Sequence, residues 1–313
     1  MAGILTQIPH RVEDFRKNRE PWRLSMTLEK RASLTAVMVA ALRAEASAWP
    51  DAICHDPWAA QLAGEEGLRY AERSKRSFPP MALWLAVRTA YIDAHVRHFI
   101  EHAGTQVVLL GAGLDTRAQR LAHPNVSFYE VDTPQSSQHK QTQLQRLDGY
   151  PLDAATYVTC NFEHQDPIER LQRAGFSTEL PAFFVWEGVT YYLTEEAVRA
   201  TVRSFAEQAH PQSLLLFDIF SKRFVRADTG QQGDRESVQM VEDMGEPFRW
   251  GTNDPLPLLF EEGLRYVDIT RFDEACLALT GSYERERMFR FQSFVLCAKQ
   301  VPSILPPLHS VQK

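Results

Sequence analysis

The chain has 313 residues, of which 44% are hydrophobic and 24% are charged, so it can bury a sizeable core and is not disordered throughout. Its net charge of −6 argues against non-specific binding to nucleic acid or to an anionic membrane, because both require a basic surface. No apolar run reaches the roughly 18 residues of a membrane span, and residues 1–20 lack the apolar stretch of a signal peptide. The cysteines are far apart and form no Cys-x-x-Cys pair, which is typical of reduced thiols in a cytoplasmic protein; they are Cys54, Cys160, Cys276 and Cys297.

The first third of the chain is rich in helix formers. Residues 26–47 contain few helix breakers, and Asp56-Pro57 is typical of a capped helix start, with Gly64 expected to close that helix. A longer helix is expected after Pro79-Pro80, because apolar residues then recur every three or four positions, at Trp84, Val87, Tyr91, Ala94 and His98. We therefore predict a helical cap over residues 1–103.

After residue 104 short apolar runs alternate with helical segments. Such continuous runs are typical of a parallel sheet with helices on both faces; they are Gln106–Leu110, Val126–Val131, Tyr157–Phe162, Ala182–Trp186 and Ser213–Phe220. Thr194, followed by two glutamates, favours a helix start, and that helix should end before Pro211. Later strands are expected at Arg265–Phe272 and Phe291–Ala298. The sequence thus predicts an α/β, Rossmann-like domain over residues 104–300, with a mostly parallel sheet of about seven strands.

Two segments do not fit this alternation. Residues 221–257 are polar, contain four glycines and show no clear period, so we expect a mobile or lid-like insertion there. Residues 301–313 contain three prolines and are expected to form a flexible tail.

Ligands of open α/β sheets bind beyond the carboxyl ends of the strands, so the residues that follow each apolar run are the informative ones. The first run ends in Gly111-Ala112-Gly113, which permits a tight turn and a close approach of backbone N–H groups to a ligand. A simple turn into a helix is the alternative, because Gly-x-Gly is common. Thr116 stands where a dinucleotide fingerprint has its third glycine, which disfavours NAD or FAD.

The second and third runs end in polar residues that suit an adenosine ligand. Glu130 and Asp132 follow Gly113 by 17 to 19 residues, and an acid there can accept hydrogen bonds from ribose hydroxyls. A solvated loop carboxylate is the alternative for each. Asn161 can accept from an adenine amino group, and Phe162 can cover the base.

The fourth run ends in Glu187, a carboxylate at the tip of a very apolar strand. Such a charge is costly to bury unless a cation meets it, which could be a ligand ammonium or a basic residue of the helical cap. Arg88 borders the apolar stripe of the long helix and suits a bidentate grip on a ligand carboxylate. A pair between Arg88 and a protein acid such as Glu187 is the alternative for both residues.

These residues resemble the leucine carboxyl methyltransferase family, which includes bacterial S-adenosylmethionine-dependent O-methyltransferases, some of them from polyketide pathways. The resemblance runs from about Ser33 to the last strand. Its specific strings are LGAGLDTR at 110–117, YEVDTP at 129–134 with Lys140, the pair at 161–162, WEGVTYYLT at 186–194 and GEPFRWG at 245–251.

The resemblance implies a class I methyltransferase fold with S-adenosylmethionine as cofactor. The implied cofactor residues are Arg88, Gly111, Gly113, Glu130, Asp132, Asn161, Phe162 and Glu187. The family usually has aspartate where this chain has Asn161, which keeps a carbonyl acceptor but loses the charge.

The expected function is methyl transfer to a carboxylate or hydroxyl of a small molecule, such as a polyketide or other secondary metabolite. The alternatives are a protein carboxyl methyltransferase, a non-catalytic S-adenosylmethionine- or nucleotide-binding protein, and an NAD enzyme on the same fold. No catalytic base is evident; a carboxylate acceptor needs none, whereas a hydroxyl acceptor would benefit from one. The sequence indicates neither the acceptor nor the oligomeric state.

Other polar residues are less specific candidates for the site. Tyr191 and Tyr192 are candidates for the acceptor pocket, with core packing as the alternative. Asp218, at the end of the fifth run, is also a candidate for the acceptor pocket, with a helix cap or a surface acid as the alternative. His95, His98 and His102 share one helix, but no cysteine or acid completes a ligand set, so no metal is expected.

Overall fold

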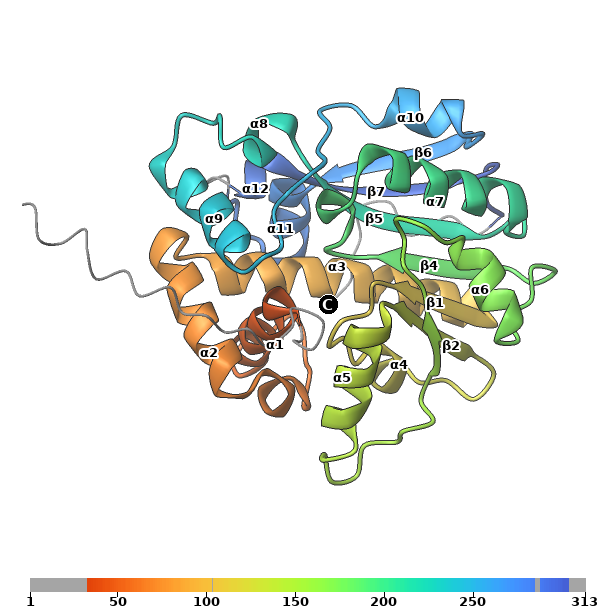
Figure 1. Cartoon of the computed structure of the whole chain (residues 1–313), viewed down its shortest axis with the longest axis horizontal. Coiled ribbons are helices and arrows are strands. Elements are labelled where there is room, and N and C mark those ends of the chain that lie inside the picture. Colours follow the sequence, from red (N-terminus) through yellow and green to blue (C-terminus); the bar gives the residue numbers. More distant parts are fainter. Residues whose placement is uncertain (1–32, 103, 285–287, 304–313) are drawn as a thin grey trace, which may run out of the picture. The chain divides into compact units, whose positions relative to one another are not determined.

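A computed structural model describes residues 33–102, 104–284 and 288–303 (Figure 1). Three predictions therefore fall partly or wholly outside the described residues: the absence of a signal peptide at residues 1–20, helix over residues 26–32, and the flexible tail beyond residue 303. All described residues belong to the unit Arg31–Lys313.

The centre of this unit is one seven-stranded sheet with the strand order β3-β2-β1-β4-β5-β7-β6. Its strands are β1 Gln106–Leu110, β2 Ser127–Asp132, β3 Thr156–Thr159, β4 Ala182–Trp186, β5 Leu214–Phe220, β6 Tyr266–Arg271 and β7 Gln292–Ala298. Strands β1 to β5 pair in parallel, and β7 runs antiparallel to both β5 and β6. The predicted mostly parallel sheet of about seven strands is confirmed. The strand order reverses beside β1, which places the carboxyl ends of β1 and β4 at the point where such sheets bind ligands.

Helices cover both faces of the sheet. They are α1 Leu34–Ser47, α2 Ala59–Ser77, α3 Met81–His102, α4 Arg117–Arg120, α5 Pro134–Leu144, α6 Pro167–Arg173, α7 Glu195–Gln208, α8 Lys222–Val225, α9 Gln232–Asp243, α10 Leu256–Glu261, α11 Phe272–Thr280 and α12 Met288–Phe291, with a 3-10 turn, η3, at Thr190–Tyr192.

Alternate residues of each strand supply two separate cores. Phe183 and Val185 of β4 pack with residues of α1, α2 and α3, whereas Phe184 and Trp186 pack with residues of α6, α7 and α10. The first core therefore continues from the helices of the first hundred residues into the sheet, and it fixes α3 against the strands that carry the site. The division into a cap and a sheet domain at residue 103 stays a prediction.

The third strand is shorter than the sequence predicts. The apolar run suggests Tyr157–Phe162, but the strand ends at Thr159. The carbonyl of Asn161 then accepts the N–H groups of His164 and Gln165, at 3.0 and 2.9 Å, so the chain turns immediately after the strand. This turn decides which of the residues at 161 and 162 faces the site.

The second helix is longer than the sequence predicts. The Asp56 carboxylate caps its start by accepting the N–H groups of Trp58 and Ala59, at 3.0 and 3.1 Å. Gly64 was expected to end the helix, and its non-helical backbone, with φ +58° and ψ −170°, does interrupt the helix there. A second helical stretch, rich in good helix formers, then extends α2 to Ser77.

The third helix is buried on more than the predicted stripe. Besides Trp84, Val87 and Tyr91, its residues Leu85, Ile92, Val96 and Phe99 are also buried. The helix lies between α1, α11 and the sheet, which explains why its buried residues are not confined to one face (Figure 1). No helix in the described ranges is both long and apolar enough to cross a membrane.

The segment 221–257 contains regular structure that the sequence did not indicate. It holds α8 and α9, and the buried side chains of Phe224, Met240 and Val241 anchor it to the rest of the unit. Its glycines and exposed polar residues hide this pattern, because only one side of each short helix is apolar. The segment also supplies part of the wall of the site.

The four cysteines are all buried and unpaired. Burial raises the pKa of the Cys54 and Cys160 thiols to about 11, so both stay protonated and unreactive at neutral pH. They are structural thiols, and the expected cytoplasmic location stays a prediction.

Candidate active site

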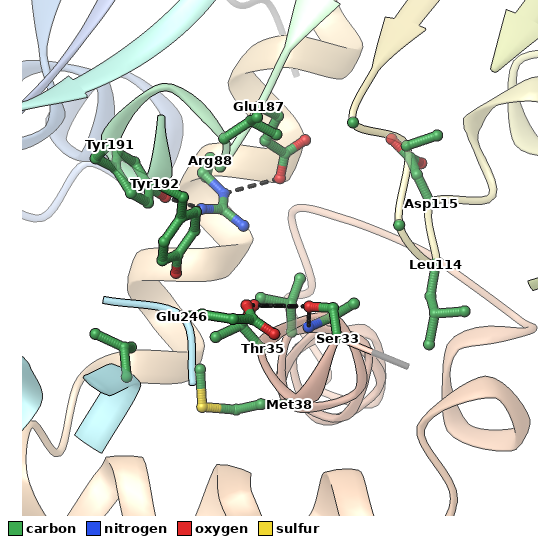
Figure 2. Close-up of a pocket in the computed structure, with 18 of the residues that line it drawn as sticks. Ser33, Thr35, Met38, Arg88, Leu114, Asp115, Glu187, Tyr191, Tyr192 and Glu246 are labelled. Atoms are coloured by element: carbon green, nitrogen blue, oxygen red, sulfur yellow. Dashed lines mark hydrogen bonds and ion pairs between the residues drawn. The ribbon is translucent and has the colours of Figure 1, made fainter. Parts of the chain in front are cut away.

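A cavity of about 260 Å³ lies where β1, β2 and β4 end, and residues of α1, α3 and segment 221–257 complete its wall. A single water molecule needs only about 10–15 Å³, so the cavity is large enough for a ligand of many atoms. Figure 2 shows Arg88 and Glu187 in its wall, between Tyr191 and Tyr192 on one side and Leu114 and Asp115 on the other.

Most of the predicted site residues meet at this one cavity. Those that line it are Arg88, Gly111, Gly113, Asp132, Phe162, Glu187, Tyr191 and Tyr192. Glu130 and Asn161 do not line it.

The glycine turn after β1 adopts a backbone that other residues avoid. Gly111 and Gly113 have φ +70° and +47°. The Gly111 N–H donates to the carbonyl of Val131, at 2.7 Å, which ties the turn to the neighbouring strand β2. A Cβ atom at Gly111 would lie 2.3 Å from Cγ2 of Val189, so no side chain fits there.

Asp132 ends β2 beside this turn. Its carboxylate accepts the N–H of Gly113 and the N–H of Thr133, each at 2.7 Å, one on each oxygen. Each carboxylate oxygen has a further lone pair, so the side chain can still accept from a ligand. Burial raises the pKa of Asp132, and the two N–H groups oppose that shift by stabilising the charged form.

Glu130 was expected beside Asp132, and the structure places it elsewhere. It lies two residues before Asp132 on the same face of β2, because side chains of a strand alternate between its faces. There Lys140 of α5 forms an ion pair with it at 2.5 Å. Both side chains are 2% exposed, and burial raises the pKa of Glu130 to about 7. Lys140 also donates to the Asp115 carbonyl. The pair supports the loop behind the cavity and contributes no side chain to its wall.

Asn161 also lies outside the cavity wall. It is exposed, its side-chain oxygen accepts the N–H of Glu163 at 3.0 Å, and its own N–H donates to the Gln165 side chain at 2.8 Å. These bonds belong to the turn after β3, which directs Phe162 toward the cavity and Asn161 away from it. An adenine contact through the Asn161 side chain is therefore not what this structure shows.

Glu187 lies between two arginines. Arg88 Nε of α3 is 2.8 Å from one of its oxygens, and Arg117 of α4 is 2.5 Å from the other. The ion pair between Glu187 and the helical cap, left open by the sequence, is present (Figure 2). Burial alone would raise the pKa of Glu187, but the charges of Arg117 and Arg88 outweigh it and lower that pKa, so the carboxylate stays ionised.

Sequence reasoning missed the network that holds Arg117. The Arg117 guanidinium also bonds to Asp93, at 2.6 Å, and to Asp115, and Arg120 bonds to Asp93 at 2.5 Å. Arg117, Asp93 and Arg120 are nearly inaccessible to solvent, and Asp115 is 13% exposed where it lines the cavity. Arg117 ends the LGAGLDTR string, so the family resemblance already pointed to it. A charged residue after a glycine turn is, however, usually interpreted as a surface residue.

Asp218 is neither a helix cap nor a surface acid. It is fully buried in β5 and accepts the Gly188 N–H at 2.7 Å and the Gln292 side-chain amide at 2.6 Å. Arg88 lies 3.7 Å from it. Burial raises the pKa of Asp218 to about 6. The residue does not line the cavity; it holds the turn that follows Glu187 and helps to place Arg88.

The two candidate tyrosines belong to a ring cluster that lines the cavity, called here the aromatic chamber: Trp84, Tyr191, Tyr192, Phe220, Phe224 and Phe248. The ring centroids of Tyr191 and Phe220 are 4.7 Å apart, and those of Tyr192 and Phe248 are 5.4 Å apart. The Tyr191 hydroxyl accepts from Arg88 at 3.3 Å. Both tyrosines therefore pack against other rings and also line the cavity, so the two interpretations of them are compatible.

Glu246 is a further wall residue that the sequence did not single out. It accepts hydrogen bonds from the Ser33 hydroxyl at 3.2 Å, the Leu34 N–H at 3.0 Å and the Thr35 hydroxyl. These donors are the first residues of α1, where the helix dipole also favours an anion. Glu246 thus joins segment 221–257 to α1 across one side of the cavity.

The histidines of α3 do not form a ligand cluster. His95 is buried, its Nδ1 lies 2.8 Å from the Tyr91 carbonyl, and burial lowers its pKa. Among the residues that the structure describes, no three His, Cys, Asp or Glu side chains gather as a metal site requires.

Replacing Gly111 by alanine tests the glycine turn. Gly111→Ala introduces left-handed strain and the contact with Val189, whereas Gly149→Ala at φ +79° has nothing within 4 Å of the new Cβ. Gly149→Ala should cost only the strain, about 1–2 kcal/mol. Gly111→Ala should lower the free energy of urea unfolding by clearly more. Equal losses would show that the turn tolerates a side chain.

Asp93→Asn tests the buried network. Removing this charge from between Arg117 and Arg120 should lower the free energy of unfolding by about 3–5 kcal/mol at neutral pH. The exposed Asp243, paired with Arg73, offers the control Asp243→Asn, which should leave that free energy nearly unchanged.

The same variant has a defined pH dependence. The arginines lower the pKa of Asp93, so its contribution is fully present above the ordinary aspartate pKa of about 4 and is lost as the pH falls below that value. The stability difference between parent and Asp93→Asn should therefore shrink on acidification. A constant difference from neutral pH to strong acid would contradict the assigned ion pairs.

Comparison with known proteins agrees with this geometry. Residues 36–206, more than half of the chain, match the leucine carboxyl methyltransferase family. A protein of Streptomyces coelicolor is 30% identical over 226 residues, 69% of this chain and 80% of that one. A protein of Mycobacterium bovis is 33% identical over 228 residues, 68% and 73% of the two chains. Both carry the provisional name S-adenosyl-L-methionine-dependent methyltransferase.

Solved structures share the fold. A DUF574 family protein from Streptomyces avermitilis has a TM-score of 0.58 at 18% identity, covering 83% of this chain and 97% of that one. A protein from Thermobifida fusca, provisionally described as a methyltransferase, has a TM-score of 0.57 at 16% identity, with 90% and 100% covered. These two structural similarities support the fold, and the sequence matches show the family. The chain belongs to the leucine carboxyl methyltransferase family.

Proposed function

We propose that the protein is an S-adenosylmethionine-dependent methyltransferase that methylates an oxygen, a carboxylate or a hydroxyl, of a small molecule. The observation that carries the proposal is the convergence of three strand ends on one cavity. The glycine turn of β1, Asp132 of β2 and Glu187 of β4 all line it, together with Arg88 of α3.

The charge of the cavity wall fits this cofactor. Its acidic residues are Asp115, Asp132, Glu187 and Glu246, and its basic residues are Arg43 and Arg88, so acids exceed bases by two among the described wall residues. S-adenosylmethionine, when bound, supplies an electrophilic methyl group on a sulfonium, and its ammonium and carboxylate cancel in charge. An acid-rich wall favours such a net cation over an anionic dinucleotide.

Each wall residue has chemistry that suits one part of the cofactor. Asp132 keeps lone pairs that can accept from ribose hydroxyls, and Phe162 offers an aromatic face to the base. Glu187 and Arg88 present an anion and a cation side by side, which match the ammonium and carboxylate of an amino acid. The Gly111–Gly113 turn leaves room beneath the ligand because it has almost no side chains.

The chain's task in such a reaction is positioning. The wall must hold the acceptor oxygen in line with the methyl group and exclude water, and the aromatic chamber next to Arg88 provides a dry surface for that purpose. A carboxylate acceptor is already anionic and needs no base. No residue is assigned as a catalytic base.

A small acceptor is favoured over a polypeptide by the bonds that Glu246 makes. They tie segment 221–257 to the start of α1 across the chamber side of the cavity. We expect this connection to restrict the access of an extended chain more than that of a small molecule.

Calorimetric titration with S-adenosylhomocysteine and, in parallel, NADH tests the cofactor class. The first should bind and the second should not. Asp132→Asn should weaken S-adenosylhomocysteine binding by about 10- to 100-fold, since hydrogen bonds to a charged group contribute about 1.5–3 kcal/mol. The exposed Asp153→Asn is the matched control and should bind like the parent. Binding of NADH alone would contradict the proposal.

A labelled-methyl assay tests the reaction. The protein is incubated with methyl-labelled S-adenosylmethionine and a panel of aromatic acids and phenols, and the products are identified by mass spectrometry. Label should appear on an oxygen of at least one small acceptor. Transfer only to nitrogen, sulfur or added protein would contradict the proposed acceptor class.

A further inference from the structure

We infer that the acceptor is an apolar molecule that carries rings and presents a neutral hydroxyl, and that Glu246 makes the chamber reject carboxylate acceptors. The inference rests on the proposed function and narrows it. It follows from the aromatic lining of the chamber, from the charge of Glu246 beside it and from the ion pairs that Arg88 already makes.

The chamber wall is mostly aromatic and suits an apolar acceptor that carries rings. Its rings meet at varied angles: Tyr191 and Phe248 are edge to face, with centroids 5.3 Å apart, whereas Phe220 and Phe224 are stacked at 4.5 Å. Aromatic ligands bind favourably in both arrangements. Four methionines also line the cavity, and their flexible thioethers adapt to irregular ring systems; they are Met38, Met81, Met240 and Met288.

Glu246 gives this apolar space a negative charge. Its carboxylate accepts three hydrogen bonds from the start of α1, which hold it in the wall of the cavity. Within the described ranges no lysine or arginine forms an ion pair with it. Glu246 is close to the chamber, because its charge, after burial, is the next largest cause of the raised pKa of Tyr192 (Figure 2).

The cation nearest to the chamber is already engaged by protein acids, and under the proposed function it also faces the carboxylate of the cofactor. Arg88 lies over the Trp84 ring, at 4.7 Å from its centroid, and it is paired with Glu187 at 2.8 Å and lies 3.7 Å from Asp218. The other arginine of the wall, Arg43, bonds to Asp56 and to the Leu114 carbonyl. A carboxylate acceptor would thus lose its water, meet no unpaired arginine of the described wall and face Glu246. A neutral hydroxyl avoids that cost and can donate a hydrogen bond to the carboxylate.

The test compares two probes with the same ring system. 2-Naphthol is neutral at pH 7 and 2-naphthoate is anionic, and each is titrated into the protein saturated with S-adenosylhomocysteine. The parent should bind 2-naphthol at least about tenfold more tightly, as expected for one partly buried charge at close range. Glu246→Gln should reduce this ratio by at least about fivefold, mainly by tighter binding of 2-naphthoate.

Two further variants separate charge from structure. Glu242→Gln makes the same change at an exposed position of α9 outside the cavity wall and should keep the parent ratio. Thr35→Val removes one donor to Glu246 but keeps its charge, so it should also keep the preference for 2-naphthol. If Thr35→Val and Glu246→Gln lose the preference equally, the effect comes from loosening α1 and the inference is wrong.

The outcomes also separate this inference from the proposed function. Binding of S-adenosylhomocysteine with equal or tighter binding of 2-naphthoate would overturn the inference and leave the methyltransferase proposal standing. Binding of neither naphthalene probe would overturn the inference in the same way. Failure to bind S-adenosylhomocysteine would overturn both.

Discussion

The ion pairs of Glu187 hold the site together. One carboxylate at the tip of β4 meets Arg88 from α3 and Arg117 from α4, so it connects the first helices of the described unit to the sheet and to the glycine turn. A carboxylate in so apolar a setting is stable only because a cationic group lies beside each of its oxygens. Those donors are themselves fixed by Asp93, Asp115 and Asp218, which leaves few alternative arrangements.

The same constraint shapes the cavity. Because Arg88 is drawn toward Glu187 and Asp218, it forms the boundary between the strand ends and the aromatic chamber (Figure 2). The strand-end side is polar, with Asp132 and the backbone of Gly111 to Gly113. The chamber side is mostly apolar, and its polar groups are Glu246 with its donors at the start of α1, Ser237 and the tyrosine hydroxyls. One cavity therefore offers two environments, as a transferase that binds a polar cofactor and an apolar acceptor requires.

Several features could be predicted from the sequence because they depend on local patterns. The apolar runs that became β1 and β4 have the predicted bounds, and the glycines after β1 and the acid after β4 stand where such sheets bind ligands. Glu130 and Asn161 could not be placed in this way. Glu130 is drawn to Lys140, which is ten residues away in sequence, and Asn161 is turned outward by bonds within one tight turn. Sequence spacing gives the strand end but not the direction in which each side chain points.

Long-range pairing was also beyond the sequence. Arg117 and Asp93 are 24 residues apart, and Glu246 and Thr35 are 211 apart, so no periodicity connects them. The helices of segment 221–257 were missed because their apolar residues are few and separated by glycines and charges. These are the parts of the site that depend on tertiary contacts, and they include the residue that we infer to select the acceptor.

The most direct test of the central claim is a crystal structure of the protein with S-adenosylhomocysteine. The account predicts the ribose hydroxyls within hydrogen-bond distance of Asp132, the base against Phe162, and the amino-acid end beside Arg88 and Glu187. A ligand bound in another cavity, or one that touches neither Asp132 nor Glu187, would contradict it.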